Sequence, residues 1–326
     1  MGRYLLAIAI PAVLATYIPF CTPALQPTML PWNAPLSSLW RLPTDLSQRD
    51  LFNGPWGAER APDPHAVYTL VEVKHHGSNP GMTVRDGKGR KWSVKQAPLD
   101  GLPAEGPVEV AVSRVLSAIG YHQPPVYYLP EFTLSDDWGS HVERGGRFRL
   151  SDKSLKDRGE WSWQQNPFVG MRPYQGLLVT LLLFNSSDFK NSNNTLYDHR
   201  VGDRVEPWYV VRDLGMALGD TGRIAPMRND PDLFSRSEFI LGIENGFVRF
   251  HYHGWHQELV RDRIEPDDVR FATELLSQLT DRQWSDAFRA AGYLPAVADT
   301  YIRALNMRVT HAKAVACPHL AAAKGR

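Results

Sequence analysis

The stretch from Asn185 to Tyr197 reads Asn-Ser-Ser-Asp-Phe-Lys-Asn-Ser-Asn-Asn-Thr-Leu-Tyr and directly follows an apolar segment, Gln175 to Phe184 (QGLLVTLLLF). The apolar segment carries no charge and is too short to cross a bilayer, so it predicts a buried helix. A buried helix delivers the polar side chains that follow it to one place in the fold. Asp188, Lys190 and Asn193, at relative positions 0, +2 and +5, are therefore the first candidate site residues.

The chain has 326 residues, enough to bury a large core in one large or two smaller domains. It contains 36 basic and 35 acidic residues, and this net charge of +1 gives no electrostatic footprint for nucleic acid or an anionic membrane. The two cysteines, Cys21 and Cys317, belong to no CxxC or Cys/His cluster, which argues against a zinc site or a disulfide framework. One disulfide bond between Cys21 and Cys317 is an alternative that the sequence leaves undecided.

Residues 1–24 have the pattern of a targeting segment, in which a short positive flank precedes a mostly apolar run from Tyr4 to Phe20. We expect export to the periplasm or the exterior with cleavage after Ala24, or anchoring in the membrane by the same residues. A lipoprotein modified at Cys21 and a buried N-terminal helix are the alternatives. Residues 25–64 are rich in Pro and Trp without a sustained period, which predicts an extended arm lying on the following domain.

Residues 65–150 have a β-rich pattern with one helix inserted after the third strand. The helix is expected over Pro107 to Gly120, where apolar residues repeat at helical spacing. A glycine-containing loop between the first two strands, which includes Gly77 and Gly81, can lie over phosphate groups with its backbone N–H groups. The expected strands are Val67–Val73, Met82–Arg85, Lys91–Gln96, Pro124–Leu129 and Gly146–Leu150.

This pattern of strands and helix is expected to place two charged residues, Lys95 and Glu109, near each other. Lys95 lies in the third strand on the face opposite Val94, and Glu109 lies in the first turn of the helix, beside its apolar stripe. The helix can therefore offer Glu109 to Lys95 as an ion-pair partner. Glu105 is an alternative partner, and Glu109 alternatively serves only the helix dipole.

The sequence pattern of residues 151–316 predicts mainly helices, and a tail follows over residues 317–326. A strand ending at Arg212 runs directly into Asp213-Leu214-Gly215, which presents a carboxylate at the end of a strand. Further on, His251, His253 and His256 form an HxHxxH pattern among aromatic residues. This pattern offers a metal-dependent hydrolase as a distant alternative, although packing and surface exposure explain it more simply.

In this order, the features resemble the protein-kinase-like superfamily, and specifically its atypical branches. The motifs that carry the resemblance are the glycine-containing loop, Lys95, Glu109, Asp188-x-Lys190-x-x-Asn193 and Asp213-Leu214-Gly215, within residues 67–225. The related branches are the HipA-type bacterial kinases, the secreted kinases of the casein-phosphorylating type, and uncharacterised bacterial proteins sharing stretches such as EWSWxxNPF.

The resemblance implies an α+β, two-lobed protein-kinase-like fold. Residues 65–150 would form a small antiparallel β lobe with one helix, and residues 151–316 a larger, mainly helical lobe. It also implies an ATP-dependent phosphotransferase with Mg²⁺ or Mn²⁺ as the metal, acting on a hydroxyl of a protein or a small molecule. The implied roles are nucleotide binding by Lys95, Glu109, Gly77 and Gly81, catalysis by Asp188 as base and Lys190, and metal binding by Asn193 and Asp213.

Two departures from ordinary protein kinases limit this reading. Ser186 and Ser187 replace the His-Arg that precedes the catalytic Asp, so control by a phosphorylated activation loop is not expected. No Ala-Pro-Glu follows Asp213, so the docking of a peptide substrate has no support in the sequence. Because export would also separate the protein from cytoplasmic ATP, a catalytically inactive kinase-fold binding protein is the main alternative.

Overall fold

Five strands close into a barrel in which the strand order is β1-β2-β3-β5-β4. Neighbouring strands are antiparallel except for β1 and β4, which run parallel over a short register. Because side chains alternate along a strand, one set fills the barrel with aromatic residues that include Tyr68, Trp92 and Phe148. The strands are β1 (Val67–Lys74), β2 (Gly81–Arg85), β3 (Lys91–Gln96), β4 (Val126–Asp136) and β5 (Gly139–Leu150).

The structure is a computed structural model, and it describes residues 34–74, 79–98, 101, 103–222 and 227–316. Each of the five strands expected from the sequence is present in it, and β4 and β5 are longer than expected. The inserted helix, α1, spans Glu105–Ala118 and starts two residues before the expected Pro107. It is buried along almost its whole length and packs against β3, β4 and β5.

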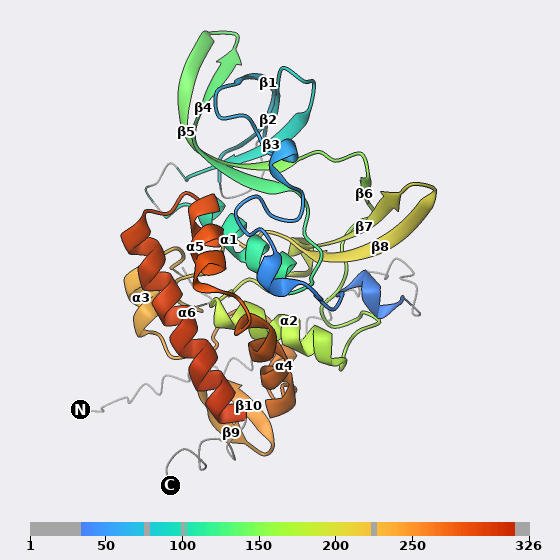
Figure 1. The fold of residues 1–326 in the computed structure, drawn as a ribbon, viewed down its shortest axis with the longest axis vertical. Coiled ribbons are helices and arrows are strands. Elements are labelled where there is room, and N and C mark those ends of the chain that lie inside the picture. The colour runs from blue at the N-terminus through green and yellow to red at the C-terminus, as the bar shows by residue number, and fades with distance from the viewer. Residues whose placement is uncertain (1–33, 75–78, 99–100, 102, 223–226, 317–326) are drawn as a thin grey trace, which may run out of the picture. The chain divides into compact units, whose positions relative to one another are not determined.

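The remainder of the described chain contains the other α-helices and two small sheets. Figure 1 shows the barrel strands at the top of the view, the long helices at the bottom and α1 between them. The helices are α2 (Arg172–Leu183), α3 (Pro231–Arg236), α4 (Pro266–Leu276), α5 (Asp281–Ala290) and α6 (Pro295–Ala316). The sheets are β6 (Leu155–Asp157), β7 (Asn194–Val201) and β8 (Arg204–Val211), and the hairpin of β9 (Ile240–Glu244) and β10 (Phe247–Phe250).

The helix α2 contains the apolar segment that precedes the polar run, and its side chains are buried from Pro173 to Leu183. It packs against α4 and α6. A capping box begins α5, because the side chains of Thr280 and Gln283 each accept from the other residue's backbone N–H. The packing of α2 against α4 and α6 holds the helix from which the polar run begins.

Residues 34–64, the described part of the expected arm, consist of short 3₁₀ turns and extended chain held against α1 and α5. The Trp40 indole donates to the carbonyl of Ile119 at 2.8 Å, just past the end of α1. The Gln283 amide of α5 donates to the carbonyl of Leu46 at 2.7 Å. The arm is therefore fastened by hydrogen bonds as well as by the burial of Leu39, Leu46 and Leu51.

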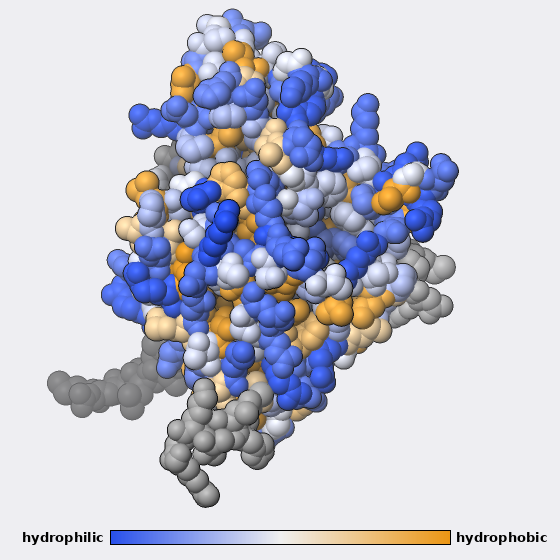
Figure 2. Space-filling view, in the orientation of Figure 1, coloured by the Kyte–Doolittle hydropathy of each residue, from blue (hydrophilic) through white to orange (hydrophobic). Residues whose placement is uncertain are grey.

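Several predictions concern residues outside the described ranges: the targeting segment over residues 1–24, Gly77, and the cysteines Cys21 and Cys317. Across the described helices, none has the length and apolar character needed to cross a membrane. On the face that Figure 2 presents, hydrophobic side chains lie in small groups among hydrophilic ones.

Candidate active site

Most of the predicted site residues line a single cavity of about 520 Å³. The cavity takes residues from β1, β2 and β3 of the barrel, from α1, and from the segments that follow α2 and β8. Its volume lies in the range of roughly 300 to 1,000 Å³ that small-molecule sites occupy. The predicted residues that line it are Gly81, Lys95, Asp188, Lys190, Asn193 and Asp213.

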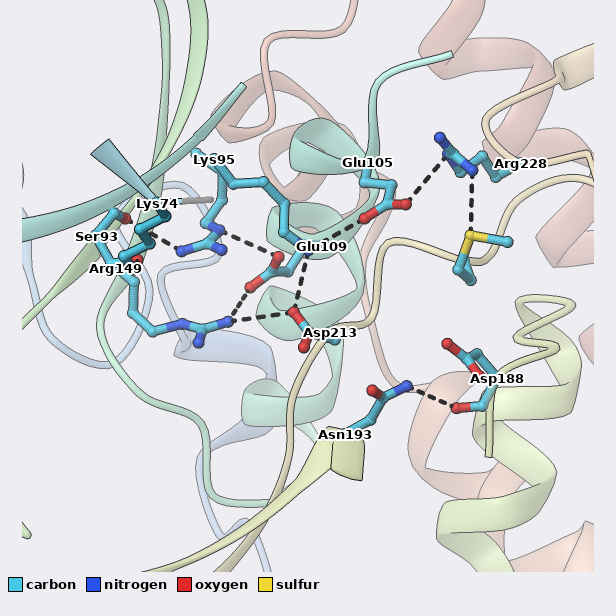
Figure 3. Close-up of polar contacts among 12 residues, drawn as sticks. Lys74, Ser93, Lys95, Glu105, Glu109, Arg149, Asp188, Asn193, Asp213 and Arg228 are labelled. Atoms are coloured by element: carbon cyan, nitrogen blue, oxygen red, sulfur yellow. Dashed lines mark hydrogen bonds and ion pairs between the residues drawn. The ribbon is translucent and has the colours of Figure 1, made fainter. Parts of the chain in front are cut away.

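Lys95 is held between two carboxylates inside this cavity. Its Nζ donates to Glu105 at 3.1 Å and to Asp213 at 3.1 Å (Figure 3). The predicted partner, Glu109, does not make this ion pair, and the alternative partner Glu105 does. Burial lowers the pKa of Lys95, but Glu109, Asp213 and Glu105 outweigh burial and raise that pKa above its ordinary value. Lys95 is therefore held in the charged form.

Glu109 instead forms a buried ion cluster with two arginines of β5. Arg147 donates to Glu109 at 3.1 Å, and Arg149 makes a second, shorter contact with it. The side chains of Glu109 and Arg147 are almost completely buried. Burial acts to raise the pKa of Glu109, but Arg147 and Arg149 hold that pKa well below its ordinary range. Glu109 is thus a buried structural anion that also contributes negative charge near Lys95.

The position of the first residues of α1 explains why Glu105 replaces Glu109. Residues four apart lie on the same face of a helix, so Glu105 and Glu109 both point toward β3 and β5. Because α1 begins at Glu105, this residue lies one turn nearer the cavity. The loop that carries Asp213 comes close at this point, since a Cβ added to Gly215 would lie 2.5 Å from the Cβ of Glu105. Glycine at position 215 is therefore required for this close approach.

Asp188 lies in the polar run after α2, with its side chain facing the cavity. Its Oδ1 forms an ion pair with the Nζ of Lys190 at 3.1 Å but accepts no hydrogen bond of good geometry from a described residue. The Lys190 ammonium lies 5.3 Å from the centre of the Trp255 ring, a cation–π distance. Trp255 is itself tied to the same run, since its backbone N–H donates to the carbonyl of Ser187 at 3.0 Å. The Asp188 carboxylate is thus paired with Lys190 at the cavity wall.

Asn193 and Asp213 offer oxygen atoms to the same cavity. The Asn193 amide nitrogen donates to the backbone carbonyl of Asp188 at 3.0 Å, which leaves its amide oxygen on the side of Asp213 in Figure 3. Asp213 has a positive φ of 50°, which is uncommon for a non-glycine residue and turns the chain sharply after β8. Burial and Glu109 act to raise the pKa of Asp213, but Lys95 and Arg149 lower it overall, so the carboxylate is charged.

This pair of oxygen donors fits a hard divalent cation. Mg²⁺ binds oxygen ligands, and it usually takes one or two carboxylates from the protein together with phosphate oxygens and water. The charged carboxylate of Asp213 and the amide oxygen of Asn193 supply such a partial ligand set. A nucleotide would complete it.

The ends of β1 and β2 that flank the glycine-containing loop lie at the cavity. Lys74 ends β1 and Gly81 begins β2, and both line the cavity together with Asn79. A Cβ at Gly81 would make only ordinary van der Waals contacts, so the space around this residue does not demand glycine. Gly77 lies outside the described residues.

Four cationic residues in or beside the cavity were not among the predicted site residues: Lys74, Arg147, Arg149 and Arg228. A sequence signal exists for the β5 pair, because Arg147 and Arg149 flank the buried Phe148 and therefore share the face opposite the barrel core. No local signal marks Arg228. It is joined to Pro103, 125 residues earlier, by a hydrogen bond of 3.0 Å.

The charge of the cavity lining favours an anionic ligand. Among the described residues that line it, five side chains are cationic and three are carboxylates, which leaves a net formal charge of +2. The cations are Lys74, Lys95, Arg147, Lys190 and Arg228, and the carboxylates are Glu105, Asp188 and Asp213. A cavity with this charge complements the negative charge of a magnesium-bound nucleoside triphosphate.

The histidine pattern does not form a metal site. The rings of His251 and His253 pack edge to face with centroids 4.7 Å apart, whereas His256 bonds Glu258 at 2.6 Å. Within the described ranges, no group of three or more His, Cys, Asp or Glu side chains could hold a metal ion. A larger hollow of about 660 Å³ lies beside the β9–β10 hairpin and contains His253, but none of the predicted kinase residues. The described residues therefore offer no metal cluster that would support the hydrolase alternative.

Comparisons with known proteins give matches only among solved structures. No model of a protein family matches the chain, and no curated protein sequence matches it. The proinflammatory kinase CtkA of Helicobacter pylori is 11% identical, with a TM-score of 0.45 over 78% of this chain and 99% of that one. The Golgi casein kinase, solved with Mn and ADP bound, is 10% identical, with a TM-score of 0.38 over 78% of this chain and 73% of that one.

A third kinase is also similar to this chain. It is the Rio2 kinase of Chaetomium thermophilum, which is 12% identical, with a TM-score of 0.30 over 77% of this chain and 71% of that one. The structural neighbours are thus kinases. Because their identities and TM-scores are low, the functional interpretation depends on the geometry of the cavity.

Proposed function

We propose that the chain has a two-lobed, protein-kinase-like fold and is an ATP-dependent phosphotransferase that uses Mg²⁺ or Mn²⁺. The observation that carries this proposal is the convergence in one cavity of Lys95, Asp188, Lys190, Asn193 and Asp213. Lys95 and Asp213 are 118 residues apart in the chain and only 3.1 Å apart at their charged atoms. The narrower assignment to a HipA-type or other bacterial branch stays a prediction.

The residues of the cavity support a defined division of roles. Lys95, held charged by Glu105 and Asp213, binds nucleotide phosphates. Asn193 and Asp213 hold the metal, which would neutralise phosphate charge when bound. Lys190 steadies the phosphoryl group as it moves. The predicted nucleotide role of Glu109 passes to Glu105.

Asp188 acts as the base for the acceptor hydroxyl. The acceptor hydroxyl oxygen forms a bond to the γ-phosphorus while the bond from that phosphorus to the β–γ bridging oxygen breaks. The hydroxyl proton passes to the Asp188 carboxylate, and ADP leaves with the electron pair of the broken bond. Catalysis of this kind consists mostly of positioning and charge neutralisation, which fixed side chains such as Lys95 and Lys190 provide.

The experiment is incubation of the purified protein with γ-labelled ATP, Mg²⁺ or Mn²⁺, and extracts of the source cells. We expect a labelled protein or small molecule in the wild-type reaction, and none above background with Asp188→Asn or Asp213→Asn. If the wild type labels nothing but still binds ATP, the inactive kinase-fold binding protein becomes the better account. If it neither labels nor binds ATP, the proposal is wrong.

A further inference from the structure

Arg228 is a cavity residue to which the proposed mechanism gives no role. Its side chain is about 10% exposed, and it follows β8 and precedes α3. Its Nε donates to the carbonyl of Pro103 at 3.0 Å, and the amide of the next residue, Asn229, donates to the carbonyl of Ala104 at 3.0 Å. These bonds fix Arg228 against the segment that enters α1.

Some N–H donors of the Arg228 guanidinium make only weak hydrogen bonds, or none, to the described residues. A guanidinium has five N–H donors in a fixed plane. The nearest partner of Nη1 is the sulfur of Met216 at 3.4 Å, and a thioether is a weak acceptor. Glu105 lies 3.5 Å from Nε, and within the described part of the chain Nη2 has no hydrogen-bond partner. A largely buried cation with unused donors in a cavity is a site for an anion.

The contacts of Arg228 connect it to both the nucleotide residue and the acceptor residue. On one side Glu105 joins it to Lys95, since Glu105 lies 3.5 Å from Arg228 and 3.1 Å from Lys95 (Figure 3). On the other side Met216, which contacts Arg228, accepts a hydrogen bond of 3.1 Å from the N–H of Ser187. Ser187 directly precedes Asp188. Lys95, Asp188 and Arg228 all line the same cavity, so a phosphoryl group that moves from a nucleotide on Lys95 to a hydroxyl at Asp188 stays in the cavity that Arg228 lines.

We propose that Arg228 forms the subsite for the terminal phosphoryl group, so that the cavity selects a nucleoside triphosphate over a diphosphate. This inference rests on the proposed function. The planar guanidinium matches phosphate oxygens in a bidentate way, and a cationic arginine at the moving group stabilises the charge that develops there. Arg228 would thus supply from within the chain a second cation beside Lys95.

The experiment compares four ligands with Mg²⁺, namely ATP, ADP, tripolyphosphate and pyrophosphate, by calorimetry on the full chain. We expect the wild type to prefer ATP over ADP and tripolyphosphate over pyrophosphate. Arg228→Gln should weaken ATP and tripolyphosphate by about tenfold or more and change the shorter anions by no more than about twofold. The affinities of Arg228→Lys should be intermediate, and those of Arg270→Gln, which changes a partly exposed residue of α4, should match the wild type.

Each outcome of these titrations either supports or rejects the phosphoryl subsite at Arg228. Equal losses for long and short anions would mean that Arg228 acts only by supporting Glu105, and the subsite would be rejected. If both Arg228 variants unfold, the wild type alone decides, because equal affinity for ATP and ADP and for the two polyphosphates overturns the subsite. Binding of tripolyphosphate without ATP contradicts the nucleotide part of the proposed function, while the two polyphosphates still test Arg228. Failure to bind any of the four rejects both proposals.

Discussion

At the scale of single residues, Asp188 and Asp213 have separate expected tasks. Asp188→Asn keeps the shape of the side chain but removes the base, so phosphoryl transfer should fall by about 10² to 10⁴-fold. Affinity for ATP should stay near the wild-type value, because Asp188 faces the acceptor. Single-turnover transfer and calorimetric binding, measured on the same preparation, check this. A large loss of ATP affinity in Asp188→Asn would contradict the assignment of this residue to the acceptor.

The two glutamates of α1 should differ in what they support. Glu109→Gln removes the counter-ion that the buried Arg147 and Arg149 share, so the free energy of unfolding should fall by about 3 to 5 kcal/mol. Glu105→Gln should cost less stability and weaken ATP binding more, because Glu105 holds Lys95. Urea denaturation and ATP titration of both variants give the comparison. The reverse pattern would restore Glu109 as the functional partner of Lys95.

Glu109 also gives a prediction about pH. The pKa of Glu109 is lower in the folded protein than in the unfolded chain, where a glutamate titrates near about 4.3. Its contribution to stability is therefore full above about pH 4.3 and is lost as the pH falls toward the folded pKa. Denaturation midpoints measured from neutral to acidic pH should fall more steeply for the wild type than for Glu109→Gln. Parallel curves would show that Glu109 does not carry this charge.

At the scale of elements, Gly215 allows the Asp213 loop to lie against the start of α1. Gly215→Ala forces its Cβ against Glu105, and such overpacking costs about 1 to 3 kcal/mol of folding free energy. Because the displaced atoms belong to Glu105, which forms an ion pair with Lys95, ATP affinity should fall as well. Gly87→Ala is the matched control, since a Cβ there meets nothing within 4 Å. An alanine at position 215 with wild-type stability and ATP affinity would disprove this packing.

Arg308 of α6 should hold the end of α2, from which the candidate catalytic run begins. Its buried guanidinium donates to the carbonyl of Leu183 at 2.8 Å, to the Asn185 amide oxygen at 2.8 Å and to the carbonyl of Phe234 at 3.0 Å. Arg308→Met leaves these acceptors unsatisfied, so we expect a loss of about 3 kcal/mol or more in urea denaturation. Arg303→Met, exposed on the same helix, should change little. Similar values for the two variants would contradict this.

The elements were largely predictable because their signals are local. Alternating and β-rich runs predicted β1, β2 and β3, and the helical spacing of valines predicted α1. The choice between Glu105 and Glu109 was not predictable, because it depends on where α1 begins and how it is rotated against β3. Arg228 and Arg308 have no sequence signal, since their bonds join residues 125 and 123 positions apart. Such contacts come from packing between elements rather than from local pattern.

At the scale of the whole molecule, the expected targeting segment over residues 1–24 gives a prediction about where the protein acts. We propose that this segment exports or anchors the chain. A fusion of residues 1–30 to a reporter that works only outside the cytoplasm should be active, and a fusion that starts at residue 31 should not. Full-length, uncleaved protein in the soluble cytoplasm would contradict export, and it would remove the difficulty that ATP is scarce outside the cell.

The whole account depends on the cavity that brings Lys95, Asn193 and Asp213 together, and titration of the purified chain with ATP in the presence and absence of Mg²⁺ tests it most directly. We predict one saturable site that requires Mg²⁺, is lost in Asp213→Asn, and is kept in Asp198→Asn, a partly exposed residue of β7. No binding up to millimolar ATP, or unchanged binding in Asp213→Asn, would contradict the central claim.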